Sequence, residues 1–237
     1  MLSSSDINKP RQQAGTDHIV SAQSALVSQE KGSNIRASIW GDTIFVDYAT
    51  RWVKVHLIQD TSGDSTLEAK EYFERDCMPQ NLLLKHYHAD NGRFAENTFK
   101  QDCESKMQHL NFCGVGAHQQ NGVSERIIKD LTFYSRTLIL HAQHYCTEYI
   151  TIMIWPFALV ASADRMNNLH VEMNGKTPER QISDTIESTT RLSNFHTFGY
   201  PVYILDASLQ SVGGGGPPKW DPQACLGIYL DHSPSHA

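Results

Sequence analysis

The order of strand-like and helix-like stretches between residues 43 and 144 limits the fold of this chain more than any other feature. Residues 43–48 and 52–58 are short runs rich in β-branched and aromatic side chains, which are typical of strands. After them the apolar periodicity predicts a helix over 65–77, a strand over 82–88, a helix over 96–107, a strand over 109–113 and a helix over 124–144. This order predicts an α/β fold in which helices cover a central sheet.

Local signals set the expected limits and faces of these elements. A first strand is expected over residues 18–28, where the alternation is weak. Ser65 with Glu68 three residues later fits a capping box at a helix start. In two later helices an apolar stripe is expected to face the core: Phe99, Cys103 and Met107 in one, and Ile127, Leu131, Tyr134, Leu138 and Ala142 in the other.

Two acidic motifs lie inside this pattern. Asp90 stands in His-Ala-Asp-Asn-Gly, just after an expected strand, and Glu125 stands in Asn-Gly-Val-Ser-Glu-Arg, at the start of the longest expected helix. A strand end and a helix start can converge when the helix packs on the sheet. Carboxylates that converge are the hard oxygen ligands that Mg²⁺ or Mn²⁺ prefers. Each motif alone also fits a plain turn or helix start.

Taken together, these motifs resemble the second and third acidic motifs of Ty1/copia-type retrotransposon integrases, which have a retroviral integrase catalytic core of the RNase H-like superfamily. Asp90 and Glu125 are separated by 34 residues, close to the family spacing. The resemblance covers residues 18–237 and continues in Pro-Phe-Ala-Leu (156–159), in 176–183 and in 198–206. It implies an RNase H-like mixed five-stranded sheet flanked by helices, followed by a small SH3-like β segment.

The resemblance also implies a division of the chain. Residues 1–17 are polar and are expected to be a disordered N-terminus. Residues 18–185 would form the integrase catalytic core, and residues 190–237 the SH3-like retroviral-type β domain, truncated at its end. No stretch has the spacing of the His/Cys zinc module that integrases carry before the core, so that module is expected to be absent. The start at Met1, with no protease or reverse transcriptase attached, suggests a fragment of a degenerate element.

By the same resemblance the chain would act in DNA integration, as a polynucleotidyl transferase that recombines DNA. Asp90 and Glu125 would be catalytic and would bind Mg²⁺ or Mn²⁺ in a two-metal site. His118, Arg126 and Lys129 would contact nucleic acid. The implied partners are the element's DNA ends and the target DNA, and an active form would be a homo-oligomer.

The first of the three family carboxylates is the gap in this comparison. In the family it lies on the first strand, and the corresponding stretch here contains Gln23, through replacement or a short deletion. Asp17 is near but out of register on the expected strand, and Asp47 belongs to the segment that resembles the second strand. An amide binds Mg²⁺ more weakly than a carboxylate, so weak or no catalysis is expected.

Three functions therefore remain open from the sequence. The first is an active integrase core, and the second is an inactive relic of that core that only binds nucleic acid or protein. The third is another RNase H-like nuclease, which ranks last because such an enzyme would lack the downstream SH3-like segment. Whether the chain is an enzyme stays undecided.

Composition bears on partners and location. A net charge of −6 and a pI near 6 are not typical of nucleic-acid-binding domains, which tend to be basic. The five cysteines are scattered without a Cys-x-x-Cys pair, which favours reduced thiols over a zinc ribbon. The polar N-terminus has no apolar segment for a signal peptide, and no stretch suits a membrane span. A nuclear or cytoplasmic, non-secreted protein is expected.

Overall fold

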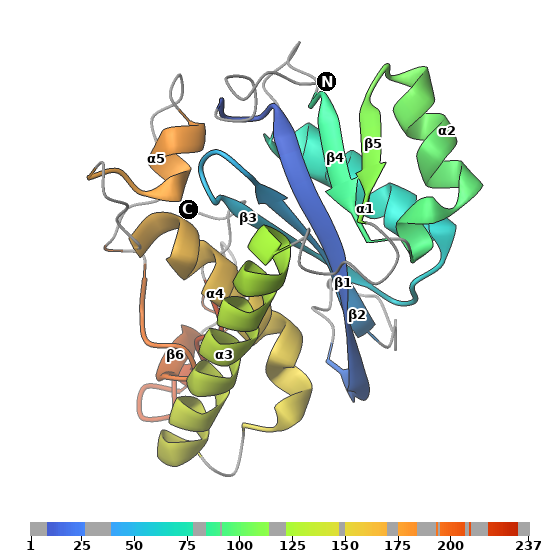
Figure 1. Cartoon of the computed structure of the whole chain (residues 1–237). Coiled ribbons are helices and arrows are strands. Elements are labelled where there is room, and N and C mark those ends of the chain that lie inside the picture. Colours follow the sequence, from blue (N-terminus) through green and yellow to red (C-terminus); the bar gives the residue numbers. More distant parts are fainter. Residues whose placement is uncertain are drawn as a thin grey trace.

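The computed structural model describes residues 9–26, 39–77, 84–90, 92–113, 122–146, 150–169, 175–183, 193, 195–206, 209 and 218–231 (Figure 1). The main sheet contains β1 (Gln13–Ala25), β2 (Ile39–Asp47), β3 (Val53–Ile58), β4 (His86–Ala89) and β5 (His109–Phe112). The helices are α1 (Gly63–Cys77), α2 (Asn97–Ser105), α3 (Gly122–Tyr145), α4 (Trp155–Leu169) and α5 (Pro178–Ile182), with short 3-10 turns η1 (Arg93–Ala95) and η3 (Ile152–Ile154). The predicted α/β fold with a five-stranded mixed sheet is confirmed.

Strand β1 lies at the centre of this sheet, whose order is β3-β2-β1-β4-β5. Strand β2 runs antiparallel to its two neighbours, β1 and β3, whereas β1, β4 and β5 run parallel. Thr16 of β1 pairs with Ala89 of β4, and Ala89 pairs with Phe112 of β5. The three parallel strands therefore reach the same edge of the sheet together.

Each face of the sheet is covered by two helices (Figure 1). Ile44 and Val46 of β2 pack in a core with Leu131 of α3 and Ala158 of α4. Successive strand residues point to opposite faces. Phe45 accordingly packs on the other side, in a core formed with α1 and α2.

The first strand begins earlier than the sequence suggested. We expected it at His18 after a disordered N-terminus, but β1 starts at Gln13 and so includes residues 13–17. Gln13 pairs with His86 of β4, and Ala14 pairs with Asp47 of β2. Pairing on both sides outweighs the weak strand propensity of this polar segment.

Three local expectations were wrong in detail. The start of α1 is capped by Ser62, whose hydroxyl accepts the backbone N–H of Ser65 at 3.2 Å, and not by a box of Ser65 and Glu68. Met107 lies past the end of α2 and is 88% exposed. On α3, Tyr134 is half exposed and Ser135 is buried in its place. Ser135 bonds to Ser162 of α4 at 3.1 Å, so close helix packing selects the smaller residue.

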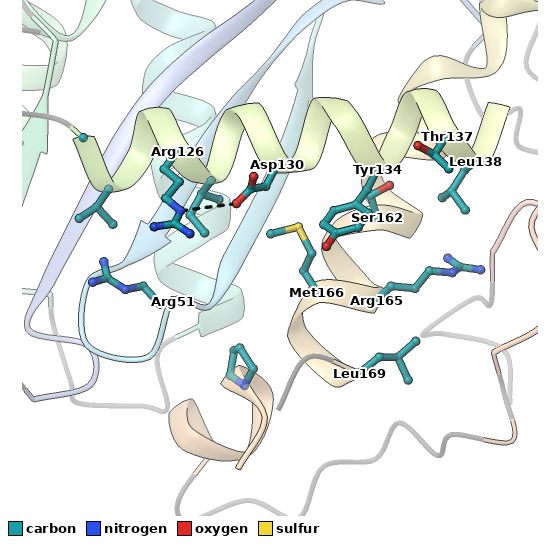
Figure 2. Close-up of a pocket in the computed structure, with 14 residues that line it drawn as sticks. Arg51, Arg126, Asp130, Tyr134, Thr137, Leu138, Ser162, Arg165, Met166 and Leu169 are labelled. Atoms are coloured by element: carbon teal, nitrogen blue, oxygen red, sulfur yellow. Dashed lines mark ion pairs between the residues drawn. The ribbon is translucent and has the colours of Figure 1, made fainter. Parts of the chain in front are cut away.

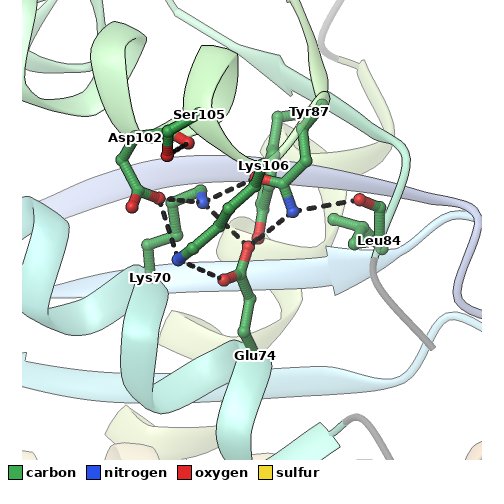
Figure 3. A network of polar contacts seen from close by, with 8 residues as sticks. Lys70, Glu74, Leu84, Tyr87, Asp102, Ser105 and Lys106 are labelled. Atoms are coloured by element: carbon green, nitrogen blue, oxygen red, sulfur yellow. Dashed lines mark hydrogen bonds and ion pairs between the residues drawn. The ribbon is translucent and has the colours of Figure 1, made fainter. Parts of the chain in front are cut away.

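A buried ionic network joins α1, α2 and β4 (Figure 3). Lys70 on α1 is fully buried, and its ammonium group pairs with Glu74 at 2.8 Å and with Asp102 of α2. The same group donates to Gln108 Oε1 at 2.7 Å, and Tyr87 of β4 donates its hydroxyl proton to Glu74 at 2.8 Å. A buried cation persists only when paired in this way.

A small second sheet follows, with antiparallel strands β6 (Pro201–Leu205) and β7 (Ala224–Ile228). It attaches to the main core through Phe198, which is 2% exposed, and through Gly199, whose lack of a side chain lets the backbone pass against Ala142 of α3. Two strands do not form a barrel, and the SH3-like domain over residues 190–237 stays a prediction. No helix among the described residues is long and apolar enough to cross a bilayer.

Candidate functional site

Two acidic residues stand side by side at the edge where the parallel strands end. Thr16 and Ala89 are paired in register, so the next residues, Asp17 and Asp90, occupy the following row of the sheet. Cys113 follows Phe112 in the same row on β5, and its backbone N–H donates to the Ala89 carbonyl at 3.1 Å. Asp17 and Asp90 are both half-buried.

The start of α3 lies over the same face of the sheet. A Cβ atom on Gly15 would collide with the Ser124 hydroxyl and lie 2.6 Å from Cε1 of Tyr48, so β1 passes closely beneath this helix. Asp17 is two residues after Gly15 and therefore points to the same face. Glu125, next to Ser124, is exposed in the first turn of α3.

The charges of these carboxylates act on one neighbouring group, the thiol of Cys113. Burial of Cys113 raises the pKa of its thiol, and the negative charges of Asp90, Glu125 and Asp17 raise that pKa further. Carboxylates on β1, at the end of β4 and on α3 thus influence the same thiol electrostatically. His88 of β4 completes this group, with its Nε2 3.4 Å from the Cys113 sulfur.

The strand pairing corrects the position that the sequence analysis gave to Asp17. The sequence placed Asp17 out of register, but Asp17 is the β1 residue that stands beside Asp90. Gln23 lies within the irregular stretch between Val20 and Ala25, where its carbonyl accepts the Trp155 indole N–H at 3.2 Å. Gln23 is six positions further along β1, which is about 20 Å for an extended strand.

Asp47 has a structural role on the opposite face. It pairs with Ala14, whereas Val46 pairs with Gly15, so its side chain points away from α3. Its carboxylate accepts the backbone N–H groups of Arg11 at 2.8 Å and Thr50 at 2.9 Å, together with the Thr50 hydroxyl at 2.8 Å. Burial raises the pKa of Asp47, and these hydrogen bonds oppose that rise. It shapes the turn between β2 and β3.

Tyr48 and His18 lie near the row of Asp17 and Asp90, and both are uncharged in the folded protein. Burial raises the pKa of Tyr48 to about 12, so the phenol stays protonated beside Gly15. His18 points to the other face and stacks on Phe94 with ring centroids 4.4 Å apart. Burial and the charge of Arg93 lower the pKa of His18 to about 4, which keeps this ring neutral.

The predicted nucleic-acid contacts are only partly placed by the structure. Arg126 and Lys129 are exposed on α3, and the Arg126 Nε atom lies 3.9 Å from Asp130. His118 lies outside the described residues, as do Asn91 and Asn121 of the two motifs. The sequence did not place Asp17 beside Asp90, because only pairing between distant strands reveals this position.

The donor chemistry of Asp17, Asp90 and Glu125 fits a hard divalent cation, since such cations prefer carboxylate oxygens. Within the described part of the chain, however, no three His, Cys, Asp or Glu side chains stand close enough to ligate one ion together. The described side chains thus include suitable metal donors, but these donors are not arranged at distances that would bind one ion together.

Solved structures with this architecture decide the fold. The integrase catalytic core of HTLV-2, solved with magnesium in a trimeric form, matches with a TM-score of 0.50 and 17% identity over 73% of this chain and 96% of that one. The catalytic core of BIV integrase matches with a TM-score of 0.51 and 15% identity over 74% of this chain and 95% of that one.

The fold is that of a retroviral integrase catalytic core. A larger match comes from the simian T-cell lymphotropic virus intasome solved with the PP2A regulatory subunit B56 gamma, with a TM-score of 0.56, 13% identity, and coverage of 94% of this chain and 69% of that one. The integrase core fold thus accounts for the order of strands and for the position of α3 over β1. No protein-family model matches the chain.

Proposed function

We propose that this chain is the catalytic core of a Ty1/copia-type retrotransposon integrase, in which Asp17, Asp90 and Glu125 bind Mg²⁺ or Mn²⁺ for DNA strand transfer. The position of Asp17 and Asp90 in one row of the sheet supports this most. In addition, the negative charge of Glu125 raises the pKa of the Cys113 thiol, as the charges of Asp17 and Asp90 do. The bound ions would stabilise the charge that develops on the phosphoryl oxygens during in-line displacement.

The protein's own residues would position the DNA. Arg126 and Lys129 project from α3 next to Glu125, where their cations would contact phosphates on either side of the reacting bond. His118, in the segment before α3, is proposed to join them. Because the chain carries a net charge of −6, DNA contact would depend on such local cations. Since the HTLV-2 core was solved in dimeric and trimeric forms, a homo-oligomer of this chain is proposed as well.

The alternative is a folded relic that binds nucleic acid or protein without catalysis. Among the described residues no three metal-ligating side chains lie at ligating distance, and this favours the relic. Glu125 is exposed, so assembly of the site would require its side chain to turn toward the row of Asp17 and Asp90.

Manganese binding and strand joining separate these functions. Mn²⁺ binding would be followed by electron paramagnetic resonance, and joining by transfer of a fluorescent 3′-hydroxyl oligonucleotide into plasmid DNA. We expect the wild-type protein to do both, and Asp17→Asn, Asp90→Asn and Glu125→Gln each to lose both. Glu68→Gln, an exposed carboxylate on α1, is the matched control.

Two results would overturn parts of this proposal. A wild-type protein that binds no Mn²⁺ and joins no DNA is the relic. Normal activity of Asp17→Asn beside an inactive Asp90→Asn would remove Asp17 from the site and leave the first ligand unassigned.

A further inference from the structure

A groove of about 1000 Å³ runs along the flank of α3 that faces α4 (Figure 2). Its near wall is α3 from Gly122 to Leu138, which corresponds to about 25 Å of helix. Its far wall is α4, and Arg51 of the β2–β3 turn and Pro178 of α5 close one end. Glu125 and Lys129 do not line it, so the groove is distinct from the carboxylate row, although Arg126, proposed above to contact DNA, borders both.

The walls of this groove are held in place. Ser135 of α3 bonds to Ser162 of α4, and the Asn167 side chain bonds to both the N–H and the carbonyl of Val53 at 2.9 and 2.8 Å. The Trp52 indole donates to Glu179 of α5 at 2.6 Å, which fixes α5 against the turn. A preformed groove loses little conformational freedom when a ligand enters.

Apolar side chains line most of the length of the groove. They come from both helices and from α5, and they are Val123, Ile127, Leu138, Met166, Leu169 and Pro178. Tyr134 lies between them and is 49% exposed, so its ring is available to a partner. Methionine and tyrosine at such a surface are typical of protein contacts, because they adapt to or pack against apolar side chains.

The charge of the groove has the opposite sign to that of the whole chain. Three arginines, Arg51, Arg126 and Arg165, line it with one carboxylate, Asp130, whereas the chain has a net charge of −6. Arg165 is held by the carbonyls of Ala161 and His196 at 2.8 and 2.9 Å. The backbone N–H of Arg51 donates to the Asp47 carbonyl at 2.9 Å, and within the described part of the chain its guanidinium group makes no hydrogen bond or ion pair. This end of the groove therefore attracts carboxylates.

We propose that this groove binds an acidic, amphipathic helix of a protein partner, with carboxylates against Arg51 and Arg126 and apolar side chains along α3 and α4. The apolar lining and the central Asp130 disfavour a nucleic-acid backbone, which needs continuous cationic contacts and offers no apolar face. A helix of about 16 residues matches the length of the groove. Helices bind grooves of this kind through side chains at helical spacing.

The test selects peptides from a random 16-residue library displayed on phage, with the purified protein in metal-free buffer. Selected peptides are then synthesised, and their binding is measured by fluorescence anisotropy. We expect acidic residues at one end and leucine, isoleucine or phenylalanine at helical spacing. Arg51→Glu and Tyr134→Ala should each weaken binding by about tenfold, the loss typical when an interface anchor is removed.

Two substitutions on α3 are matched controls. Arg136→Glu and Phe133→Ala change exposed residues of the same kinds outside the groove, and binding should stay within about twofold. Circular dichroism confirms that each variant is folded. The proposal is overturned if no peptides are enriched, if they lack acidic residues, or if Arg51→Glu binds them equally.

A duplex DNA probe gives the remaining outcome. If a 16-base-pair duplex binds and Tyr134→Ala weakens it, the groove belongs to nucleic acid and the proposal is wrong. Peptide binding needs neither metal nor strand transfer, so failure of the integrase proposal would leave this result unaffected.

Discussion

The backbone of Gly15 lies directly beneath the side chain of Ser124, where β1 passes under the first turn of α3. A methyl group at position 15 would overlap the Ser124 hydroxyl and would crowd Tyr48 at 2.6 Å. Glycine at this position therefore allows α3 to carry Glu125 over the row that contains Asp17. The spacing between one strand and one helix determines whether the three carboxylates share a neighbourhood.

Replacing this glycine should loosen the whole site. We expect Gly15→Ala to lower the free energy of unfolding by about 1–3 kcal/mol, because a packed core tolerates an added methyl group poorly. Urea denaturation measures this change. Gly122→Ala is the control, because a Cβ atom there would meet nothing within 4 Å. Equal stability of the two variants would show that β1 and α3 are not in close contact.

Removal of the buried cation at the centre of the ionic network should be costly. Lys70→Met leaves the carboxylates of Glu74 and Asp102 without that partner, so we expect a loss of about 3–5 kcal/mol. Thermal and urea unfolding provide the measurement. Arg93→Ala breaks an exposed pair with Glu96 and should cost about 0–1 kcal/mol. A Lys70 variant as stable as the Arg93 variant would contradict the buried network.

The same network predicts sensitivity to acid. Burial alone would raise the pKa of Glu74, but the hydrogen bond and charge of Lys70, with bonds from Gln108 and Lys106, lower that pKa to about 2. The unfolded chain takes up this proton near pH 4.5, before the folded protein does. Stability is therefore present above pH 4.5 and is lost as the pH falls toward 2. The free energy of unfolding, measured across this pH range, should depend less steeply on pH in Glu74→Gln than in the wild-type protein.

Asp42 should make stability depend on pH in the opposite direction. It is fully buried on β2, and among the described residues neither carboxylate oxygen has a hydrogen-bond partner. Burial raises the pKa of Asp42 well above its ordinary value of 3.8, so the folded protein keeps a proton that the unfolded chain releases. Its contribution to stability is full below pH 3.8 and is lost as the pH rises through the folded pKa.

Substitution of Asp42 tests this directly. Asp42→Asn cannot ionise, so it should gain about 1–3 kcal/mol relative to the wild-type protein at pH 8 and little at pH 4. Urea unfolding at the two pH values gives the comparison. Asp60→Asn, at an exposed carboxylate before α1, is the matched control. A gain that is the same at both pH values would mean that Asp42 does not titrate.

Much of the architecture followed from local patterns. The hairpin of β2 and β3 and the long helix α3 were predicted because alternation and helical periodicity report burial directly. The start of β1 was missed because Gln13 to Asp17 has no such pattern and is held by its two neighbouring strands. The exposed Tyr134 and the buried Ser135 show that a stripe can be displaced by one position when two helices pack closely.

Some residues of the candidate site were likewise predictable from local sequence, and others were not. Asp90 and Glu125 were found from local motifs, each in a recognisable turn or helix start. Asp17 has no local signal, because its position beside Asp90 depends on parallel pairing between strands far apart in the sequence. The separation of Asp47 from Asp17 likewise depends on which face of the sheet each side chain occupies.

The central position of the first strand has a consequence for biosynthesis. A nascent chain makes β1 first, yet its parallel neighbour β4 leaves the ribosome only after β2, β3 and α1. Contacts between such distant segments slow folding, because long loops must close before the contacts form. Glu125 is made only when the first turn of α3 has emerged. A translation product that stops before Glu125 therefore contains Asp17 and Asp90 but lacks the third proposed carboxylate and the helix that carries it.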